Sequence, residues 1–180
     1  STAQVRALTS TELPALSTDQ IVALTSAQVA ALTTGQISAL TTDQFSVLVT
    51  QMSSTQIANL ATTQVAGLTT DQIVAFTTAQ FRALSTAAIA ALTTDQVMAI
   101  ETVDLAALTT SQIKAMRTDE VASLTTDQIT ALSTAQVGAL STAQASNLTT
   151  DQVVALSTAQ AKALSTAAVA ALTTDQVMAI

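Results

Sequence analysis

The sequence contains no Cys, His, Trp or Tyr, and it has only three Phe, three Gly and one Pro among 180 residues. Without Cys the chain has no disulfide, no thiolate nucleophile and no cysteine ligand for a metal. Without His it lacks the usual general base and the commonest zinc ligand. We therefore expect a protein that is not an enzyme and that uses no cofactor.

Positive charge is also scarce, because five Lys and Arg stand against twelve Asp and Glu and give a net charge of −7. This balance argues against nucleic acids and anionic membranes as partners. The longest apolar run, Ala87–Leu92, is too short to span a bilayer, so we expect no membrane span. We also expect no signal peptide, since the repeat described next begins at the first residue.

An eight-residue repeat fills the chain. The unit reads Ser/Thr–Thr–x–Gln–Val/Ile–x–Ala–Leu, and 22 such octads plus a half unit at residues 49–52 account for all 180 residues. We therefore expect a single repeat array over residues 1–180 that forms a segment of a longer array. At the half unit, Val49–Met52, we expect a local break in the stacking.

Each octad carries its own helix start. Ser or Thr followed three residues later by Gln, just before an apolar residue, is a capping-box signature. In octad 69–76, Thr69 is the predicted N-cap and Gln72 the residue that bonds back to it. Asp71 lies in the first turn, where a negative charge complements the helix dipole. Position 2 is hydroxylated in every octad, so Thr70 is the alternative N-cap.

A single continuous helix does not fit an eight-residue period, because the apolar stripe would wind around it. We predict an all-α solenoid with one short helix per octad and three octads, or 24 residues, per turn. The 24-residue period comes from Asp at position 3, with one slip of eight residues. The alternative is a three-sided β-solenoid, which Thr, Val and Ile favour and Gln, Ala and Leu oppose. The Asp residues are Asp19, Asp43, Asp71, Asp95, Asp119, Asp127, Asp151 and Asp175.

Position 6 of the octad is predicted to face solvent, because it accepts Arg, Lys, Ser, Gly and Pro. In the Asp octads it is often bulky and apolar, which creates an apolar stripe edged by carboxylates. Exposed stripes of this kind mark interaction surfaces, and the alternative is that these residues turn inward and belong to the core. The candidate interface residues are Val22, Val74, Met98, Val154 and Met178.

Other candidate sites are weaker. One Asp per layer supplies too few oxygens for calcium, so we interpret the Asp column as helix-start charges on a solvated face. Two carboxylate pairs, Glu101 with Asp104 and Asp119 with Glu120, lie where the repeat is least regular, and we attribute them to repeat drift. Rows of Thr invite an ice-binding hypothesis, which the charges at position 1 oppose.

The phrases Leu–Thr–Thr–Asp–Gln–Val and Leu–Ser–Thr–Ala–Gln–Val resemble short degenerate repeats of large bacterial surface and secreted proteins. The resemblance implies an exported, non-enzymatic protein at the cell surface or outside the cell, with a cytoplasmic location as the alternative. We predict a structural repeat module that serves as a spacer, stalk or filament segment. Its partners would be neighbouring repeats or further copies of itself. The alternative function is a solenoid scaffold that binds a protein or peptide on the apolar stripe.

Overall fold

The computed structural model describes the backbone of residues 1–179, and the side chains of these residues except Thr34, Thr50 and Ala179. Ile180, the last residue of the predicted array, lies outside them. Over residues 1–179 the chain forms 21 short α-helices, two 3-10 helices and no strand. The prediction of an all-α solenoid with one short helix per octad is confirmed.

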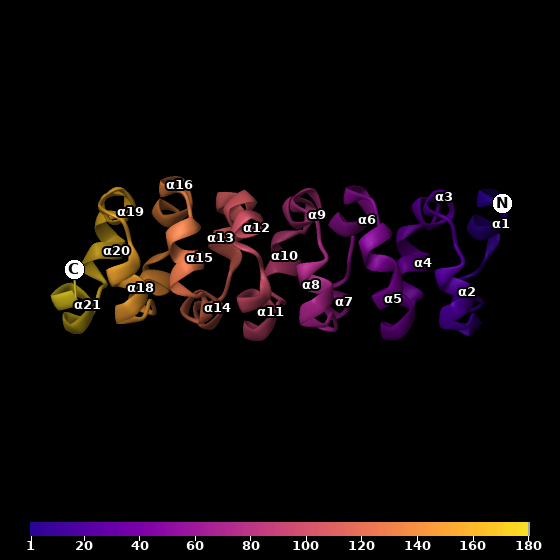
Figure 1. The fold of residues 1–180 in the computed structure, drawn as a ribbon, viewed down its shortest axis with the longest axis horizontal. Coiled ribbons are helices and arrows are strands. Elements are labelled where there is room, and N and C mark those ends of the chain that lie inside the picture. The colour runs from indigo at the N-terminus through magenta and orange to yellow at the C-terminus, as the bar shows by residue number, and fades with distance from the viewer. Residues whose placement is uncertain (180) are drawn as a thin grey trace. The chain divides into compact units, whose positions relative to one another are not determined.

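The chain divides into two compact units, unit 1 (Ser1–Ala91) and unit 2 (Leu92–Ile180). Figure 1 shows their helices. The helices of unit 1 are α1 (Thr2–Ala7), η1 (Leu13–Ala15), α2 (Thr18–Val22), α3 (Ser26–Ala30), α4 (Thr34–Ala39), α5 (Thr42–Leu48), η2 (Val49–Gln51), α6 (Ser54–Ala58), α7 (Thr62–Ala66), α8 (Thr70–Val74), α9 (Thr78–Ala83) and α10 (Thr86–Ile89). Those of unit 2 are α11 (Thr94–Ala99), α12 (Thr102–Ala107), α13 (Thr110–Ala115), α14 (Thr118–Ser123), α15 (Thr126–Ala131), α16 (Thr134–Gly138), α17 (Thr142–Ser146), α18 (Thr150–Ala155), α19 (Thr158–Ala163), α20 (Thr166–Ala170) and α21 (Thr174–Ala179).

The helices begin where the capping box predicts. The backbone N–H of Gln72 donates to Thr69 Oγ1 at 3.3 Å, and the N–H of Thr69 donates to Gln72 Oε1 at 2.8 Å. The N-cap is therefore position 1, and Thr70 is the first helical residue. Asp71 lies in the first turn as expected. Because helices of this length are unstable alone, their ends have to be fixed by caps and by neighbours.

The corners between helices consist of extended residues. Leu132, the C-cap of α15, has φ −62° and ψ 138°, and Ser133, the next N-cap, has φ −68° and ψ 158°. Two consecutive extended residues turn the chain without a left-handed conformation, and none occurs among the described residues. This geometry explains how the array turns at every octad while containing so few glycines.

The core is built from positions 5 and 8 of the octads. Val97, Leu105 and Ile129 at position 5 are almost fully buried, and Leu108 and Leu132 at position 8 are buried beside them. Position 4 is also buried through most of the array, although it carries the polar side chain of Gln. The interior of each unit therefore contains a repeated polar group that must be satisfied.

The position-4 glutamines satisfy this requirement by linking one layer of octads to another. Gln128, 2% exposed, accepts from the Thr125 N–H at 2.9 Å through Oε1. Its Nε2 donates to the carbonyl oxygens of Val97 at 2.9 Å and Ile100 at 2.8 Å, which lie 31 and 28 residues earlier. We call this repeated contact the glutamine ladder. The same two spacings recur at Gln36, Gln44, Gln80, Gln136, Gln144, Gln152, Gln160 and Gln176.

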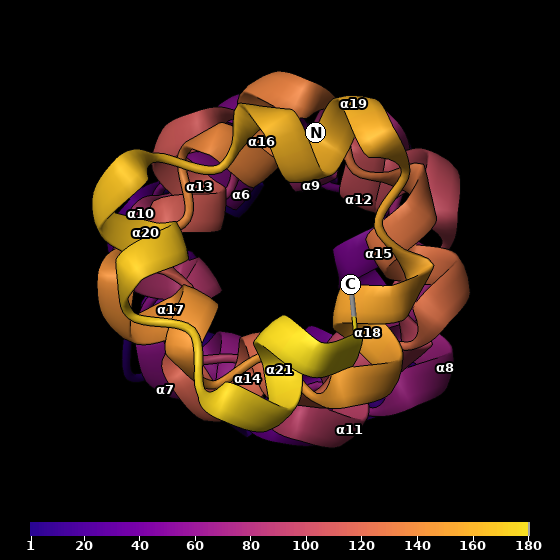
Figure 2. The same ribbon diagram turned by 90° about the vertical axis from the view of Figure 1, so that its left-hand side faces the viewer.

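One turn is longer than the predicted three octads. Helix pairs such as α12 with α15, α15 with α18 and α18 with α21 pack three octads apart, as the Asp period suggested. The glutamine ladder, however, reaches the octad four places earlier. Each helix therefore lies over the junction of two earlier ones, and a turn holds between three and four octads. Figure 2 shows α18, α19, α20 and α21 following one another around the ring. The 24-residue Asp period matches the separation of helices that pack against each other. It is shorter than the number of residues in one turn of the solenoid.

The half unit, residues 49–52, is an added copy of the second half of an octad, positions 5 to 8. Helix α5 runs without a corner into η2, and Val49 and Met52 are buried like positions 5 and 8. Gln80 donates to the carbonyls of both, at 3.3 and 2.8 Å. Gln56, in the next octad, reaches only 27 and 24 residues back, so the register of the ladder shifts by four residues here.

We predict that Gln128→Leu lowers the free energy of unfolding by about 3 kcal/mol, because it leaves buried carbonyls without a donor. The matched control is Gln20→Leu. Gln20 is exposed and accepts from the Ser17 N–H in its own capping box, so we expect a loss of about 1 kcal/mol or less. Urea denaturation followed by circular dichroism measures both. Equal losses in the two variants would show that capping, and not the glutamine ladder, is what Gln128 contributes.

Two glycines give a second prediction. A Cβ at Gly138 would lie 2.9 Å from the carbonyl oxygen of Ala163 on α19, whereas a Cβ at Gly35 would have nothing within 4 Å. We expect Gly35→Ala to stabilise the chain by about 0.5–1 kcal/mol, since Ala is the better helix former. Gly138→Ala should destabilise it by about 1–3 kcal/mol through overpacking. Thermal unfolding of the two variants compares them directly, and the same sign for both would refute the close approach of α16 and α19.

Candidate functional site

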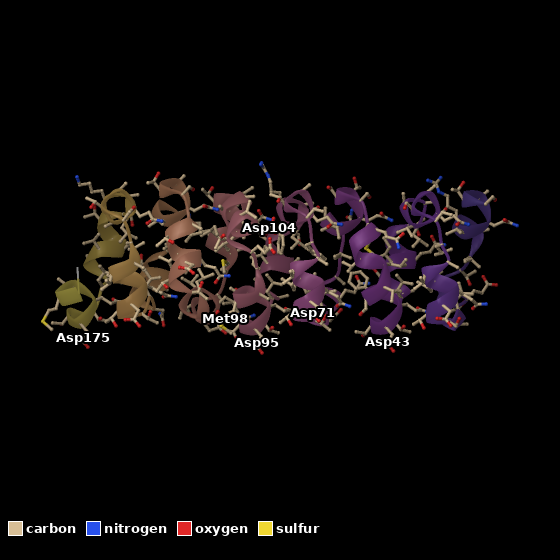
Figure 3. All side chains as sticks on the ribbon, in the orientation of Figure 1. Asp43, Asp71, Asp95, Met98, Asp104 and Asp175 are labelled. Carbon is tan, nitrogen blue, oxygen red and sulfur yellow. The ribbon has the colours of Figure 1, made fainter. Side chains whose placement is uncertain are left out.

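The Asp residues of position 3 all lie on the surface. All eight are exposed, each in the first turn of its helix. In unit 2, the Asp-bearing helices α15, α18 and α21 pack in succession. Figure 3 shows Asp95 and Asp175 along the same edge of unit 2, with Asp104 toward the opposite edge. Among the described residues, no three His, Cys, Asp or Glu side chains gather closely enough to hold a metal ion.

The candidate interface residues are exposed to solvent. The exposed fractions are 52% for Val22 and 45% for Val74 in unit 1. In unit 2 they are 45% for Met98, 62% for Val154 and 76% for Met178. Each follows an exposed Asp by three residues on the same helix, so the carboxylate and the apolar side chain are neighbours on the helix surface. Positions 3 and 6 together thus present acidic–apolar pairs to solvent. That these pairs form an interface stays a prediction.

The two carboxylate pairs combine different environments. Glu101 and Asp119 are exposed, whereas Asp104 is 4% exposed and Glu120 is fully buried. Glu101 is the N-cap residue of α12, and its carbonyl accepts from the Asp104 N–H at 3.0 Å. Asp104 and Glu120 both occupy position 4, the position of the ladder glutamines. Their burial therefore follows from their place in the octad.

Arg117 and Glu120 together replace the Thr and Gln of an ordinary octad. The Glu120 carboxylate accepts the backbone N–H of Arg117, as a capping Gln would. A carboxylate cannot donate to the carbonyl 28 residues earlier, which belongs to Leu92. Arg117 Nη2 makes that bond instead, at 3.2 Å. Its Nη1 lies 3.3 Å from Glu120 Oε1, and Nε lies 3.1 Å from Asp119 Oδ1.

Burial and the Arg117 charge act in opposite directions on Glu120. Burial raises the pKa of Glu120, while the backbone N–H and the guanidinium of Arg117 oppose the shift. The hydrogen bond from Arg117 lowers the pKa of the exposed Asp119. Among the described residues, Glu120 Oε1 is the buried side-chain atom that has no hydrogen-bond partner, although it faces the Arg117 charge. The Arg117 guanidinium therefore offsets only part of the effect of burial on Glu120.

The sequence predicts that the position-4 Gln accepts a hydrogen bond in the capping box. It does not predict the second role of Gln, the donation to carbonyls of an earlier layer in the glutamine ladder. A capping box works with Glu as well as Gln, because both accept the N-cap N–H. The chain has Gln at position 4 in 17 of 22 octads and Glu in two. This preference is the signal that the side chain must also donate, and an amide does so where a carboxylate cannot.

We predict that Glu120→Gln stabilises the chain more at neutral than at acid pH. A carboxyl whose folded pKa is raised loses stability as pH rises from its unfolded pKa, about 4.3, through its folded pKa. The free energy of unfolding of Glu120→Gln minus that of the parent should therefore grow, by on the order of 1 kcal/mol, between about pH 4 and pH 7. Urea titrations at several pH values measure it.

The control is the double variant Arg117→Thr, Glu120→Gln, which restores an ordinary octad and should show the same pH dependence as Glu120→Gln above about pH 5. At lower pH the two differ, because only Glu120→Gln keeps the Arg117 that lowers the pKa of Asp119. A difference that shrinks as pH rises would contradict the prediction, because it would mean that pairing with Arg117 outweighs burial.

Comparison with known proteins gives one result. The model of the ALTTAQ repeat family matches seven overlapping segments, at residues 1–34, 22–50, 49–78, 73–99, 97–134, 129–158 and 150–180. The family motif corresponds to octad positions 7 and 8 followed by positions 1 to 4, as in Ala131–Gln136. No curated protein and no solved structure matches the chain. Because the family matches span the whole sequence, the chain belongs to the ALTTAQ repeat family.

Proposed function

We propose that the chain is a structural repeat module, a spacer, stalk or filament segment, and that it works without catalysis. The observation that carries this proposal is the glutamine ladder. It joins layers through backbone carbonyls, so it operates at almost any octad regardless of the residues at positions 3 and 6. A lattice of this kind extends by adding octads, which is the property that a spacer requires.

We further propose that the protein is bacterial and acts at the cell surface or after secretion. The support is the resemblance of its phrases to repeats of large bacterial surface and secreted proteins, together with the lack of Cys and the scarcity of Lys. In the described residues no helix is long and apolar enough to cross a membrane.

A second candidate function is a scaffold that binds a protein or peptide. The specific observation that favours it is the exposure of the predicted interface residues Val22, Val74, Met98, Val154 and Met178, at 45–76%. Exposed apolar side chains that recur at matching positions are typical of interaction surfaces.

A spacer has to keep its ends at a fixed separation, and this can be measured because the chain has no native Cys to interfere with labelling. Spin labels would be placed at Ala3→Cys in unit 1 and Ala159→Cys in unit 2, both exposed positions. We expect pulsed electron resonance on a dilute sample to give one narrow distance distribution.

The matched control carries both labels within unit 2, at Ser111→Cys and Ala159→Cys, which are also exposed. A narrow distribution in the control with a broad one between the units would show two units on a flexible joint, and the spacer proposal would fail.

A further inference from the structure

Acidic residues at position 3 and basic residues at position 6 lie in different octads. Asp at position 3 occurs in eight octads and Lys or Arg at position 6 in four, and no octad has both. Positions 3 and 6 are neighbours on a helix surface, so Asp and Lys in one octad would form a pair within the helix. The sequence does not use this pairing and places Val or Met beside many of the Asp residues. Apart from Asp119, which pairs with Arg117 at position 1, the position-3 carboxylates are therefore available to contacts beyond the helix that bears them.

In unit 2 the segregation produces two faces. The acidic face consists of Asp95, Asp151 and Asp175 with their neighbours Met98, Val154 and Met178, on helices α11, α18 and α21. The basic face consists of Lys114 on α13 and Lys162 on α19, with α16 packed against both helices. In Figures 1 and 2, α16 and α19 lie on the upper side of unit 2, and α11 and α21 lie on the lower side. Each of these Asp, Lys, Val and Met side chains is exposed.

The chemistry of the acidic face indicates what would cover it. An apolar side chain next to a carboxylate fits a surface that offers a cation on an apolar stem, and Lys supplies both in one side chain. The basic face of this same chain carries such lysines at exposed positions of its helices. We propose that copies of this chain associate side by side, with the acidic face of one copy against the basic face of the next. This proposal rests on the structural role proposed above and specifies its partner as a second copy.

A contact between two different faces has a defined consequence for assembly. Each copy keeps one face free after docking, so association continues into open sheets or bundles and does not stop at a dimer. A single exposed ion pair contributes little and is screened by salt. The basic face supplies two lysines, so the contact depends on two ion pairs acting together and on burial of the Met and Val side chains between them.

The first measurement is the mass of the full chain by light scattering as a function of concentration. We expect the mean mass to rise with concentration at low salt. The apparent dissociation constant should rise about tenfold between roughly 0.05 and 0.5 M NaCl, because the Debye length falls over this range and the ion pairs are screened. A mass that stays at 18.3 kDa at every concentration in low salt would overturn the proposal.

The decisive experiment uses two charge-reversed variants. Lys114→Glu with Lys162→Glu makes both faces acidic. Asp95→Lys, Asp151→Lys and Asp175→Lys together make both faces basic. Each variant alone should stay monomeric, whereas an equimolar mixture should associate at least as strongly as the parent chain. Asp43→Lys is the matched control, because Asp43 has the same helix position but lies in unit 1 and is followed by Ser46 in place of an apolar residue. We expect this control to associate like the parent.

Circular dichroism checks that each variant is folded, and the neutral pair Lys114→Gln, Lys162→Gln replaces the Glu variant if that one loses helix. Replacing Met98 and Val154 with Ser should also weaken association about tenfold or more while leaving helicity unchanged. Association that persists in both charge-reversed variants would overturn the proposal. So would capture of a cationic peptide on the acidic face by a chain that never self-associates. The label distances above are measured on dilute monomers, so a failure of self-association leaves the spacer test intact.

Discussion

The structure depends on one polar contact, the donation of two amide hydrogens by a buried Gln to backbone carbonyls four octads earlier. Helices of five or six residues leave most of their backbone groups without partners inside the helix. Water satisfies such groups at a surface. The carbonyls of positions 5 and 8 belong to buried residues between layers, so they need a partner from the protein. The Gln side chain solves both problems at once, because its oxygen caps its own helix and its nitrogen caps the helix below. Apolar burial at positions 5 and 8 can then proceed without orphaned polar groups.

The exceptions at position 4 show what this contact requires. At Arg117 and Glu120 the accepting and donating roles are divided between two side chains, and the cost is a buried carboxylate whose pKa is raised. At Ala88 and Ala168 the N-cap Ser still accepts the N–H of the residue at position 4, so the helix start survives without Gln. Capping and layer linkage are therefore separable, although Gln usually performs both.

The outer surface follows different rules from the interior. The side chains of positions 3 and 6 play no part in the glutamine ladder, which uses only the backbone carbonyl of position 6. Most of these side chains therefore vary without affecting the fold, Gly138 against α19 being an exception. The charges and the exposed Val and Met residues are concentrated at these two positions. A family built in this way can change its surface while conserving its lattice. The proposed lateral association uses this freedom, because the charges of its acidic and basic faces lie at those two positions.

The sequence by itself determined the short helices, their N-caps and which apolar side chains point inward, because these depend on residues within one octad. Tertiary structure alone decided the length of a turn and the second role of Gln, because both depend on which distant octad lies beneath. Octads 93–100 and 173–180 are identical in sequence, yet Val97 is fully buried and Val177 is 55% exposed. Helix α14 packs against α11, whereas no later helix of the described chain lies over α21. The local sequence sets which side chain points inward, and neighbours far along the chain decide whether it is covered.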